Sequence, residues 1–442
     1  MRSPAHFAGL GLTALISLSF GLALSLGACA PNSDHADPGR VSSQDISAPI
    51  ADQSPVDEAI NDAVNRGVYP FLYVRVETFE GNVVYEHQAT NPALASRVPT
   101  GDSWFRLWSM SKSVTIAAIL DLEEDGVLNR SDPVTKYIPE FTDMRVLGDT
   151  TDGPSCAATP SAPARPMTIE DLLNHTDGFY YTYTQFPCLN RPMSEARLPE
   201  ATSSDDLINR IAGLPLHPSA MADYHYGIGT TVLGLVAERA TGKAFDAVIR
   251  ERITGPLNID ETLSYTLPVN TPLFPTVTGK SGTLTLAEKD DLEIFGGPVP
   301  RYRGAERAFF GGEGMVGTTR AYATFLRMMG NDGILNGVRI LDAATLADWS
   351  APKTQLDSPY GHNGFNIWVT SGKVDSMPDQ KPGLLVGGGY EGTAFWIDQE
   401  LGIVGLIMSQ VHQPVTNGAD EIARLRGAFY DNLSGTDLDR QR

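Results

Sequence analysis

Cysteine and metal-binding patterns are scarce in this sequence. Only three cysteines occur among 442 residues, and there are just eight histidines. The chain has no CxxC pair and no HExxH segment, and common structural and catalytic zinc sites depend on such spacings. We therefore expect neither a metal nor any other cofactor.

Basic residues are also few. The chain has 33 lysines and arginines against 53 acidic residues, which gives a formal net charge of −20. Proteins that bind nucleic acid need clusters of positive charge, so the balance excludes nucleic acid as a partner. It also disfavours electrostatic attachment to anionic lipid. The hydrophobic fraction of 42% is that of a globular chain with a large core or two packed lobes.

The first 28 residues differ from the rest of the chain. Arg2 precedes the nearly uncharged run FAGLGLTALISLSFGLALSLGA, and Cys29 follows it. This pattern predicts a secretory leader. The residues LGAC at 26–29 resemble the lipobox of bacterial lipoproteins, which implies cleavage before Cys29 and a lipid anchor on that cysteine. An uncleaved transmembrane anchor is the alternative, because the run is nearly long enough to span a bilayer. Either way, we expect the protein in the cell envelope, facing the periplasm or the cell exterior.

Cys156 and Cys188 are the two remaining cysteines. Two such thiols in an oxidising compartment are expected to form a disulfide, which here would close a segment rich in Pro, Ser, Thr and Ala. For a loop of this size the chain-entropy model gives about 3 to 4 kcal/mol of stabilisation. We therefore expect a local staple and no catalytic thiol.

The chain after the leader is predicted to form a tether and one domain. Residues 29–53 are polar and without periodicity, which is typical of a flexible tether, whereas residues 54–435 carry regular patterns. A helix and a hairpin come first, the middle is mainly helical, and two strands precede a closing helix. This order predicts an α/β (α+β) fold with an antiparallel sheet built from both chain ends and flanked by helices. A helical lobe would be inserted at roughly residues 110–300, with a ligand cleft between lobe and sheet.

The segment LWSMSKSVTIAAIL places Ser109 three residues before Lys112. Positions i and i+3 share one face of a helix, so the hydroxyl and the amine can come within hydrogen-bonding reach. The apolar residues that follow predict a buried helix. Burial lowers the pKa of a lysine, and a neutral amine can accept a proton from serine. The helix N-terminus would favour a developing oxyanion. Taken alone, SxxK is common and also fits a purely structural role.

The longer segment FRLWSMSKSVT resembles the first motif of the serine β-lactamase and penicillin-binding-protein superfamily, particularly the class C β-lactamase-like esterases called family VIII carboxylesterases. The resemblance extends from about Pro55 to Tyr430 and includes LLNHTDGFYY, YHYGIGTTVLGLVAERATG, GGEGMVGTTRAYATFLRMM and GGGYEGTAFWIDQELGIVGLIMSQ. It implies a β-lactamase/transpeptidase-like fold. It also implies that Ser109 is the nucleophile and Lys112 its paired lysine.

The second family motif is a tyrosine, and both Tyr224 and Tyr226 could match it. The spacing from Tyr226 to the following VLG triplet keeps the esterase pattern. The resemblance therefore implies that Tyr226 shuttles a proton between Ser109 and the leaving group, with help from Lys112. A stacked core aromatic is the structural alternative. No catalytic role is expected for two nearby histidines, His175 and His225.

The third family motif is where this sequence departs from its relatives. Lactamases have Lys-Thr-Gly there, whereas the matching residues here are Gly387, Gly388 and Gly389. Glycines permit close approach of the backbone to a substrate, but they lack the basic side chain that grips a β-lactam carboxylate. The resemblance places the oxyanion amides at Ser109 and Tyr390, and substrate contacts at the three glycines and Trp108. The competing match KSG at 280–282 is interpreted as a surface loop, because no closing strand pair and helix follow it directly.

Together these features predict a lipid-anchored, extracytoplasmic serine hydrolase that forms an acyl-enzyme at Ser109. Esters with short or medium acyl chains are the expected substrates. The alternatives within the same fold are a weak β-lactamase, a D-amino-acid peptidase and an amide hydrolase. A catalytically silent envelope binding protein is the alternative from another class. We expect a small-molecule ester, amide or lactam as the substrate, membrane contact only through the lipid on Cys29, and a monomer.

Overall fold

The computed structural model describes residues 53–150, 153–154, 156, 159–182, 187–288, 294–295, 300–358, 361–371, 381–412, 414–415 and 418–433. The chain divides into two units, Met1–Arg40 and Val41–Arg442, and all described residues belong to the second. The predicted leader, Cys29 and residues 30–52 of the predicted tether therefore lie outside the described residues. None of the helices that the structure describes is long and apolar enough to cross a membrane.

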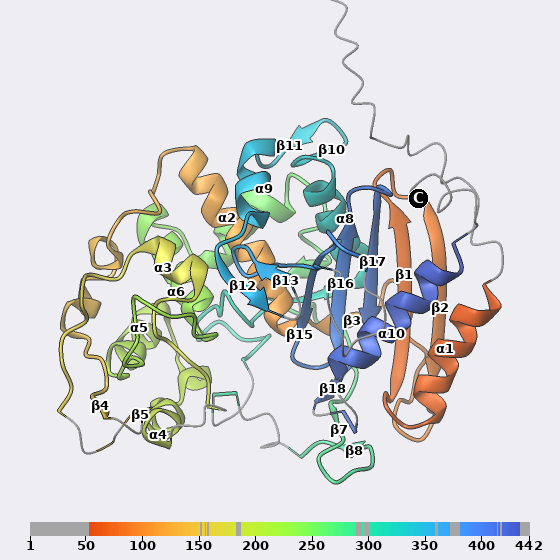
Figure 1. Ribbon diagram of the computed structural model, residues 1–442, viewed down its shortest axis with the longest axis horizontal. Helices are drawn as coiled ribbons and strands as arrows, with labels where there is room; N and C mark the ends of the chain where they lie inside the picture. Colours follow the sequence, from red (N-terminus) through yellow and green to blue (C-terminus); the bar gives the residue numbers. More distant parts are fainter. Residues whose placement is uncertain are drawn as a thin grey trace, which may run out of the picture. The chain divides into compact units, whose positions relative to one another are not determined.

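An eight-stranded antiparallel sheet organises the domain (Figure 1), in the order β12-β13-β14-β15-β16-β17-β1-β2. Strands β17 and β1 come from opposite ends of the chain and pair with Val74 opposite Ile407. This pairing confirms the expectation of a sheet built from both chain ends. The strands are β12 (Thr354–Ser358), β13 (Gly361–Asn363), β14 (Trp368–Val369), β15 (Leu385–Gly389), β16 (Thr393–Asp398), β17 (Ile403–Met408), β1 (Phe71–Thr78) and β2 (Val83–Thr90).

Both faces of the sheet are covered by helices. In β1, side chains alternate between the two faces, so that Leu72 and Val74 join a core with α1 (Ser54–Asn65) and α10 (Gly418–Asp431), visible in front of the sheet in Figure 1. Phe71 and Tyr73 point into a second core, which includes side chains of α8 (Thr319–Gly330). Every residue of β1 is buried, including the polar side chains of Arg75, Glu77 and Thr78, so both faces of this strand are covered.

A largely helical part lies between β3 (Trp104–Arg106) and β9 (Val316–Thr318) in the sequence, and Figure 1 shows several of its helices beside the sheet. Its helices are α2 (Ser111–Glu124), α3 (Ile169–Asn174), α4 (Pro187–Ala196), α5 (Ser204–Ala212), α6 (Gly229–Thr241) and α7 (Phe245–Ile249), with η2 (Trp108–Met110), η3 (Val134–Lys136), η4 (Pro139–Asp143), η5 (Leu198–Glu200) and η6 (Arg250–Thr254). The remaining elements are α9 (Ala343–Ser350), β4 (Asp149–Thr150), β5 (Gly153–Pro154), β6 (Leu263–Ser264), β7 (Val277–Thr278), β8 (Thr285–Leu286), β10 (Ile334–Leu335), β11 (Val338–Arg339) and β18 (Val411–His412).

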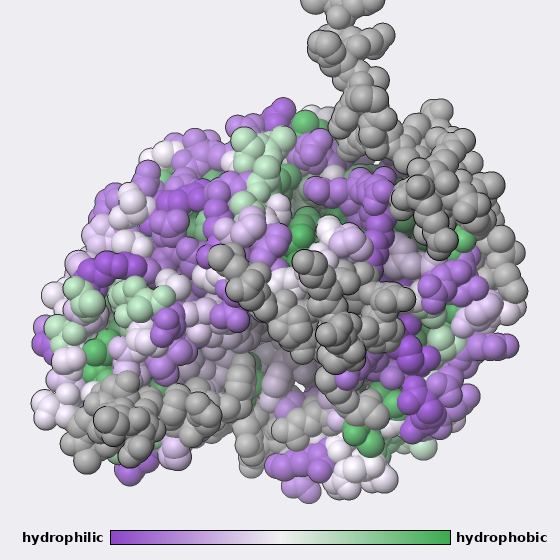
Figure 2. Space-filling model, viewed as in Figure 1, coloured by the Kyte–Doolittle hydropathy of each residue, from purple (hydrophilic) through white to green (hydrophobic). Residues whose placement is uncertain are grey.

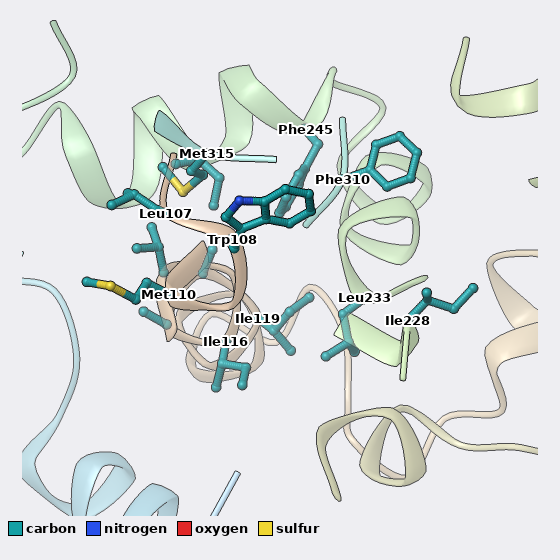
Figure 3. Close-up of a cluster of buried hydrophobic side chains, with 14 of the residues drawn as sticks. Leu107, Trp108, Met110, Ile116, Ile119, Ile228, Leu233, Phe245, Phe310 and Met315 are labelled. Atoms are coloured by element: carbon teal, nitrogen blue, oxygen red, sulfur yellow. The ribbon is translucent and has the colours of Figure 1, made fainter. Parts of the chain in front are cut away.

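Helix α2 runs through the larger core. Eleven of its 14 residues are buried, and Figure 3 shows Ile116 and Ile119 of α2 among side chains that surround the helix from several directions. Burying one aliphatic side chain of this kind contributes about 1.5 to 3 kcal/mol. The predicted buried helix is confirmed, and its surroundings leave Lys112 no route to solvent, because that residue is 0% exposed.

The ends of two helices are set by local backbone conformation. Ser54 lies inside α1, and Gln53 occupies the capping position without a side-chain hydrogen bond. Helix α3 is capped at its C-terminal end by His175, whose φ of 54° is left-handed. A capping box between Thr168 and Asp171 begins that helix and satisfies two of its free amides.

Two local predictions are borne out by the structure. Cys156 and Cys188 are joined by a disulfide with a Cα–Cα distance of 5.1 Å. Lys280 is exposed between β7 and β8, so the KSG segment is a surface loop. On the face shown in Figure 2, hydrophilic residues predominate and apolar ones form small separate groups.

Candidate active site

Ser109 lies in a sharp turn between a strand and a helix. Strand β3 ends at Arg106, the 3₁₀ turn η2 spans Trp108–Met110, and α2 starts at Ser111. Trp108 has a φ of +48°, a left-handed conformation that costs a bulky residue about 1 to 2 kcal/mol. This turn presents Ser109 ahead of the N-terminus of α2, where the helix dipole favours negative charge.

A buried ion pair holds the turn in place. Arg106 donates to Glu391 from Nε at 2.5 Å and from Nη2 at 2.9 Å, and the Nε1–H of Trp108 donates to the same carboxylate at 2.7 Å. Thr276 adds a fourth hydrogen bond to it, at 2.5 Å. Because a planar guanidinium binds a carboxylate through two parallel bonds, these contacts compensate for the strained backbone at Trp108.

The position of Trp108 corrects one expectation. Its side chain was expected to contact substrate, but it is 1% exposed and its indole nitrogen is bonded to Glu391. In Figure 3 it lies among buried apolar side chains. Trp108 therefore supports the turn that carries Ser109 and does not line the cavity described below.

Tyr226 makes the contact with Ser109. Its hydroxyl donates to Ser109 Oγ at 2.8 Å, and it lies just before α6. Tyr224, the competing match, lines the same cavity, and burial raises the pKa of its hydroxyl. The structure thus brings Ser109 and Tyr226 together from segments 117 residues apart, as nucleophile and proton carrier would require. Their catalytic roles stay predictions.

Lys112 lies in a fully buried polar cluster. Its ammonium donates to Tyr181 Oη at 2.8 Å, to the Gly312 carbonyl at 3.0 Å and to Glu313 Oε1 at 3.0 Å. Burial by itself lowers the pKa of Lys112, but the Glu313 carboxylate and the Tyr226 hydroxyl outweigh it, and the pKa is raised. The buried Glu313 carboxylate that faces the amine therefore opposes the expected lowering of the Lys112 pKa.

A cavity of about 300 Å³ opens over Ser109, at the lower end of the range for ligand sites. It lies between the helical part and the sheet, as the predicted cleft does. The described residues that line it carry no charge: they are Ser109, Ser113, Tyr224, Tyr226, Asn366, Trp368, Gly387, Gly388 and Phe395. Such walls suit a neutral substrate with an apolar portion.

Strand β15 forms the sheet side of the cavity. Gly387 and Gly388 line it, whereas Gly389 faces the turn: a Cβ there would come within 2.4 Å of the Leu107 carbonyl. Only glycine permits this close approach of two backbones. Tyr390 follows, with its ring edge-on to Trp108 at 5.4 Å between centroids. The assignment of oxyanion donors to the amides of Ser109 and Tyr390 stays a prediction.

His175 supports the cavity from behind. It is 0% exposed, and burial together with the Lys112 charge lowers its pKa to about 3, so it is neutral at ordinary pH. Its Nε2 bonds with Asn366 Oδ1 at 3.0 Å, and its ring lies 4.9 Å from that of Tyr226. His225 pairs with Ser219 instead. The hydrogen bonds described for the two histidines do not involve Ser109, and the expectation that neither is catalytic stays a prediction.

Four residues of this site were not expected from the sequence: Tyr181, Glu313, Asn366 and Glu391. Glu313 had the clearest signal, because a lone carboxylate in the segment FFGGEGMV is expensive to bury without a partner. Its partner could not be read from the segment, since Lys112 lies 201 residues away. Glu391 is likewise 285 residues from Arg106.

Comparison with known proteins agrees with this arrangement. The beta-lactamase family model matches residues 78–428. Protein Rv1367c of Mycobacterium tuberculosis is 31% identical over 316 residues, which cover 67% of this chain and 72% of that protein. Esterase EstB of Burkholderia gladioli is 26% identical over 376 residues, covering 81% and 90%.

A solved structure adds agreement at the level of the fold. EstCE1, described as a hydrolase with promiscuous acyltransferase activity, superposes with a TM-score of 0.70 at 20% identity, covering 88% of this chain and 99% of its own. This likeness confirms the expected β-lactamase-like fold. The chain belongs to the beta-lactamase family, and it is a serine hydrolase of that fold with esterase and acyltransferase relatives.

Proposed function

We propose that this protein is an esterase that forms an acyl-enzyme at Ser109 and acts on neutral esters with short or medium acyl chains. The hydrogen bond between Tyr226 and Ser109 Oγ, at 2.8 Å on the wall of an uncharged cavity, carries the proposal. Ser109 Oγ attacks the ester carbonyl, its proton passes through the Tyr226 hydroxyl to the departing alkoxide, and an alcohol leaves. Water then attacks the acyl-enzyme and releases the acid.

The walls of the cavity support a neutral ester. Tyr224, Trp368 and Phe395 supply aromatic surface for an acyl chain, and Asn366 supplies an amide. The name of the relative EstB, an esterase, agrees with this choice. A β-lactam drug carries a carboxylate, and no cationic side chain occurs among the described residues of the cavity wall.

The experiment compares a short-chain p-nitrophenyl ester with a chromogenic cephalosporin on the purified protein. Loss of a charge-assisted contact costs about 1.5 to 3 kcal/mol, roughly tenfold to hundredfold in rate. An ester also has an easier leaving group than a lactam. Because both effects favour the ester, we expect its kcat/KM to be at least about a hundred times that of the cephalosporin. Equal or better hydrolysis of the cephalosporin would place the protein with the lactamases.

We also propose that the protein is exported and anchored at Cys29 by lipid. The leader pattern and LGAC at 26–29 support this, and the Cys156–Cys188 disulfide agrees with an oxidising compartment. Mass spectrometry of the native protein should find an acylated Cys29 as the first residue, and Cys29→Ser should be released from membranes. Retention of Met1 with a free Cys29 thiol would contradict the anchor.

A further inference from the structure

The protons on Lys112 can be counted from its surroundings. Lys112 Nζ donates hydrogen bonds to Tyr181 Oη, the Gly312 carbonyl oxygen and Glu313 Oε1, and the Tyr226 hydroxyl is a further hydrogen-bonding partner. An ammonium has three N–H donors, whereas a neutral amine has two and a lone pair. The oxygen partners are therefore at least as many as the three N–H donors of the charged form, and they outnumber the two donors of a neutral amine.

None of these three oxygens donates a hydrogen bond to Lys112 Nζ. A carbonyl only accepts, and the Tyr181 hydroxyl proton is directed to Glu313 Oε1. The carboxylate accepts at both oxygens, since Thr231 Oγ1 donates to Oε2 at 2.6 Å. An ammonium at Lys112 thus finds an acceptor for each of its N–H groups without Ser109, and in that form it has no lone pair with which to accept the Ser109 proton.

Glu313 is held firmly in this position. It is 1% exposed, and Thr231, its partner at Oε2, also accepts from the Gly312 amide at 3.0 Å. A Cβ at Gly312 would come within 2.9 Å of Lys112 Nζ, so a larger residue there would displace the ammonium from its present position. The Glu313 carboxylate, the Gly312 carbonyl and the Tyr181 hydroxyl together bind the Lys112 ammonium.

We propose that Glu313 is a positioning residue that keeps Lys112 an ammonium throughout turnover, so that the Ser109 proton travels through Tyr226 alone. The proposal rests on the proposed esterase function. The Ser109 O–H bond breaks as the Oγ–carbonyl bond forms, and Tyr226 Oη takes up this proton while its own proton passes to the leaving alkoxide. Lys112 Nζ lies 5.1 Å from the centre of the Tyr226 ring, where its fixed charge stabilises negative charge on that oxygen during transfer.

The other titratable groups that face this pair do not replace Glu313. His175 has a pKa of about 3 and is neutral, and burial raises the pKa values of Tyr265 and Tyr302, which are therefore also neutral. Tyr181 and Tyr226 complete the surroundings of Lys112. Among the described groups, Glu313 is thus the carboxylate that balances the buried ammonium.

The variant Glu313→Gln tests the proposal through the pH dependence of ester hydrolysis. It preserves shape but removes the charge that raises the Lys112 pKa, so burial would then favour the neutral amine. We expect kcat/KM of the variant to fall as the pH rises, with the alkaline limb at least about one pH unit below that of the wild type. Near pH 6, where Lys112 is still charged, its activity should return to within about tenfold of the wild type.

The opposite result would follow if a neutral Lys112 were the base. Glu313→Gln would then be more active than the wild type near neutral pH, with its acid limb moved to lower pH, and the proposal would be overturned. An unmoved pH profile would overturn it as well. Glu313→Asp retains the charge and should keep the alkaline limb near its wild-type position, even if the plateau falls.

Glu77→Gln is the matched control, because Glu77 pairs with buried Arg75 at 2.5 Å on β1 and both side chains are 5% exposed. It should lower the melting temperature without moving the pH profile. If Glu313→Gln fails to fold, nitrogen NMR of lysine side chains in the wild type decides, with Lys112 identified by its absence in Lys112→Arg. The proposal requires an ammonium signal up to pH 9, and a neutral amine at pH 8 would overturn it.

The esterase function and the role of Glu313 can be disproved independently. If Ser109→Ala keeps wild-type ester hydrolysis, the proposed function is wrong and the pH experiment has no bearing on Ser109. If hydrolysis depends on Ser109 but Glu313→Gln leaves the alkaline limb in place, the function stands and the role of Glu313 falls.

Discussion

Two buried ion pairs flank Ser109 in the sequence. Arg106, three residues before it, pairs with Glu391, and Lys112, three residues after it, pairs with Glu313. All four side chains are at most 9% exposed. The pairs differ in their cations, because an arginine stays protonated at any accessible pH, whereas a buried lysine can lose its charge.

This difference separates two kinds of work. Arg106 and Glu391 also hold Trp108 and Thr276, so this pair fixes where the backbone presents Ser109. The Lys112–Glu313 pair lies beside the ring of Tyr226. It therefore determines the electrostatic potential at Tyr226, the proposed carrier of the Ser109 proton. The Arg106–Glu391 pair positions the nucleophile, and the Lys112–Glu313 pair places a positive charge near the proton carrier.

The largest expected effect comes from Ser109, which lies between the two pairs. Ser109→Ala should lower kcat for ester hydrolysis by about 10³ to 10⁶, because the nucleophile and its proton carrier act as a unit. The melting temperature should hardly change. Ser111→Ala is the control, since Ser111 Oγ accepts from the Met315 amide at 3.1 Å and its loss should cost about 1 kcal/mol of stability. If Ser109→Ala and Ser111→Ala were equally active, Ser109 would not be the nucleophile, and the two ion pairs would not flank the reacting group.

Breaking the first pair should reduce stability rather than change the pH profile. Glu391→Gln leaves Arg106 buried without its counter-charge, which should lower the free energy of unfolding by about 3 to 5 kcal/mol. Activity should fall by a similar factor at every pH. Denaturant titration and a pH series of kcat/KM measure the two effects, and the double variant Arg106→Met/Glu391→Leu should recover stability. If the alkaline limb of the kcat/KM profile moved in Glu391→Gln, the Arg106–Glu391 pair would also affect protonation in the site, contrary to the purely structural role given to it here.

The smallest effect concerns Asp177, a buried carboxylate without a cationic partner among the described residues. It is 0% exposed, and its Oδ1 accepts from the Phe179 amide at 2.6 Å. Burial raises its pKa well above the usual value. A raised carboxyl pKa means that folding favours the protonated form, so stability is lost as the pH rises above the ordinary carboxyl pKa. Asp177→Asn should therefore gain about 1 kcal/mol at pH 8 and little at pH 4.

Asp171 serves as the control of opposite sign. Burial would raise its pKa, but the hydrogen bonds from Arg165 and Thr168 outweigh burial and lower it. Its contribution to stability is present above the ordinary carboxyl pKa and is lost as the pH falls through the lowered one. Asp171→Asn should thus be less stable than the wild type at pH 8, with a smaller difference at pH 3. Parallel melting curves for the two variants at all pH values would show that neither carboxyl behaves as described.

The sequence could predict what depends on local spacing. Ser109 and Lys112 are one helical turn apart, and the local patterns in residues 71–78 and 403–408 predict two strands, which pair with each other in the sheet. The choice of Tyr226 came from a family resemblance, and its contact with Ser109 agrees with that choice. These features follow from short-range patterns or from a motif, so they can be predicted without knowing the tertiary contacts.

The charge state of the site could not be predicted in the same way. Burial of Lys112 was expected, but the carboxylate that reverses the effect of burial arrives from 201 residues away. The placement of Trp108 failed for a similar reason, because Glu391 draws its indole into the core from 283 residues away. Contacts between distant segments decide protonation and side-chain direction, and no local pattern contains them.

The most direct test of the central claim is labelling with a fluorophosphonate probe, followed by peptide mass spectrometry. The account predicts one adduct, on the peptide that contains Ser109, with no adduct in Ser109→Ala and labelling retained in Ser111→Ala. Pre-incubation with a short-chain ester should slow the labelling, since both compete for the same hydroxyl. No adduct on the wild type, or an adduct that persists at another residue in Ser109→Ala, would contradict it.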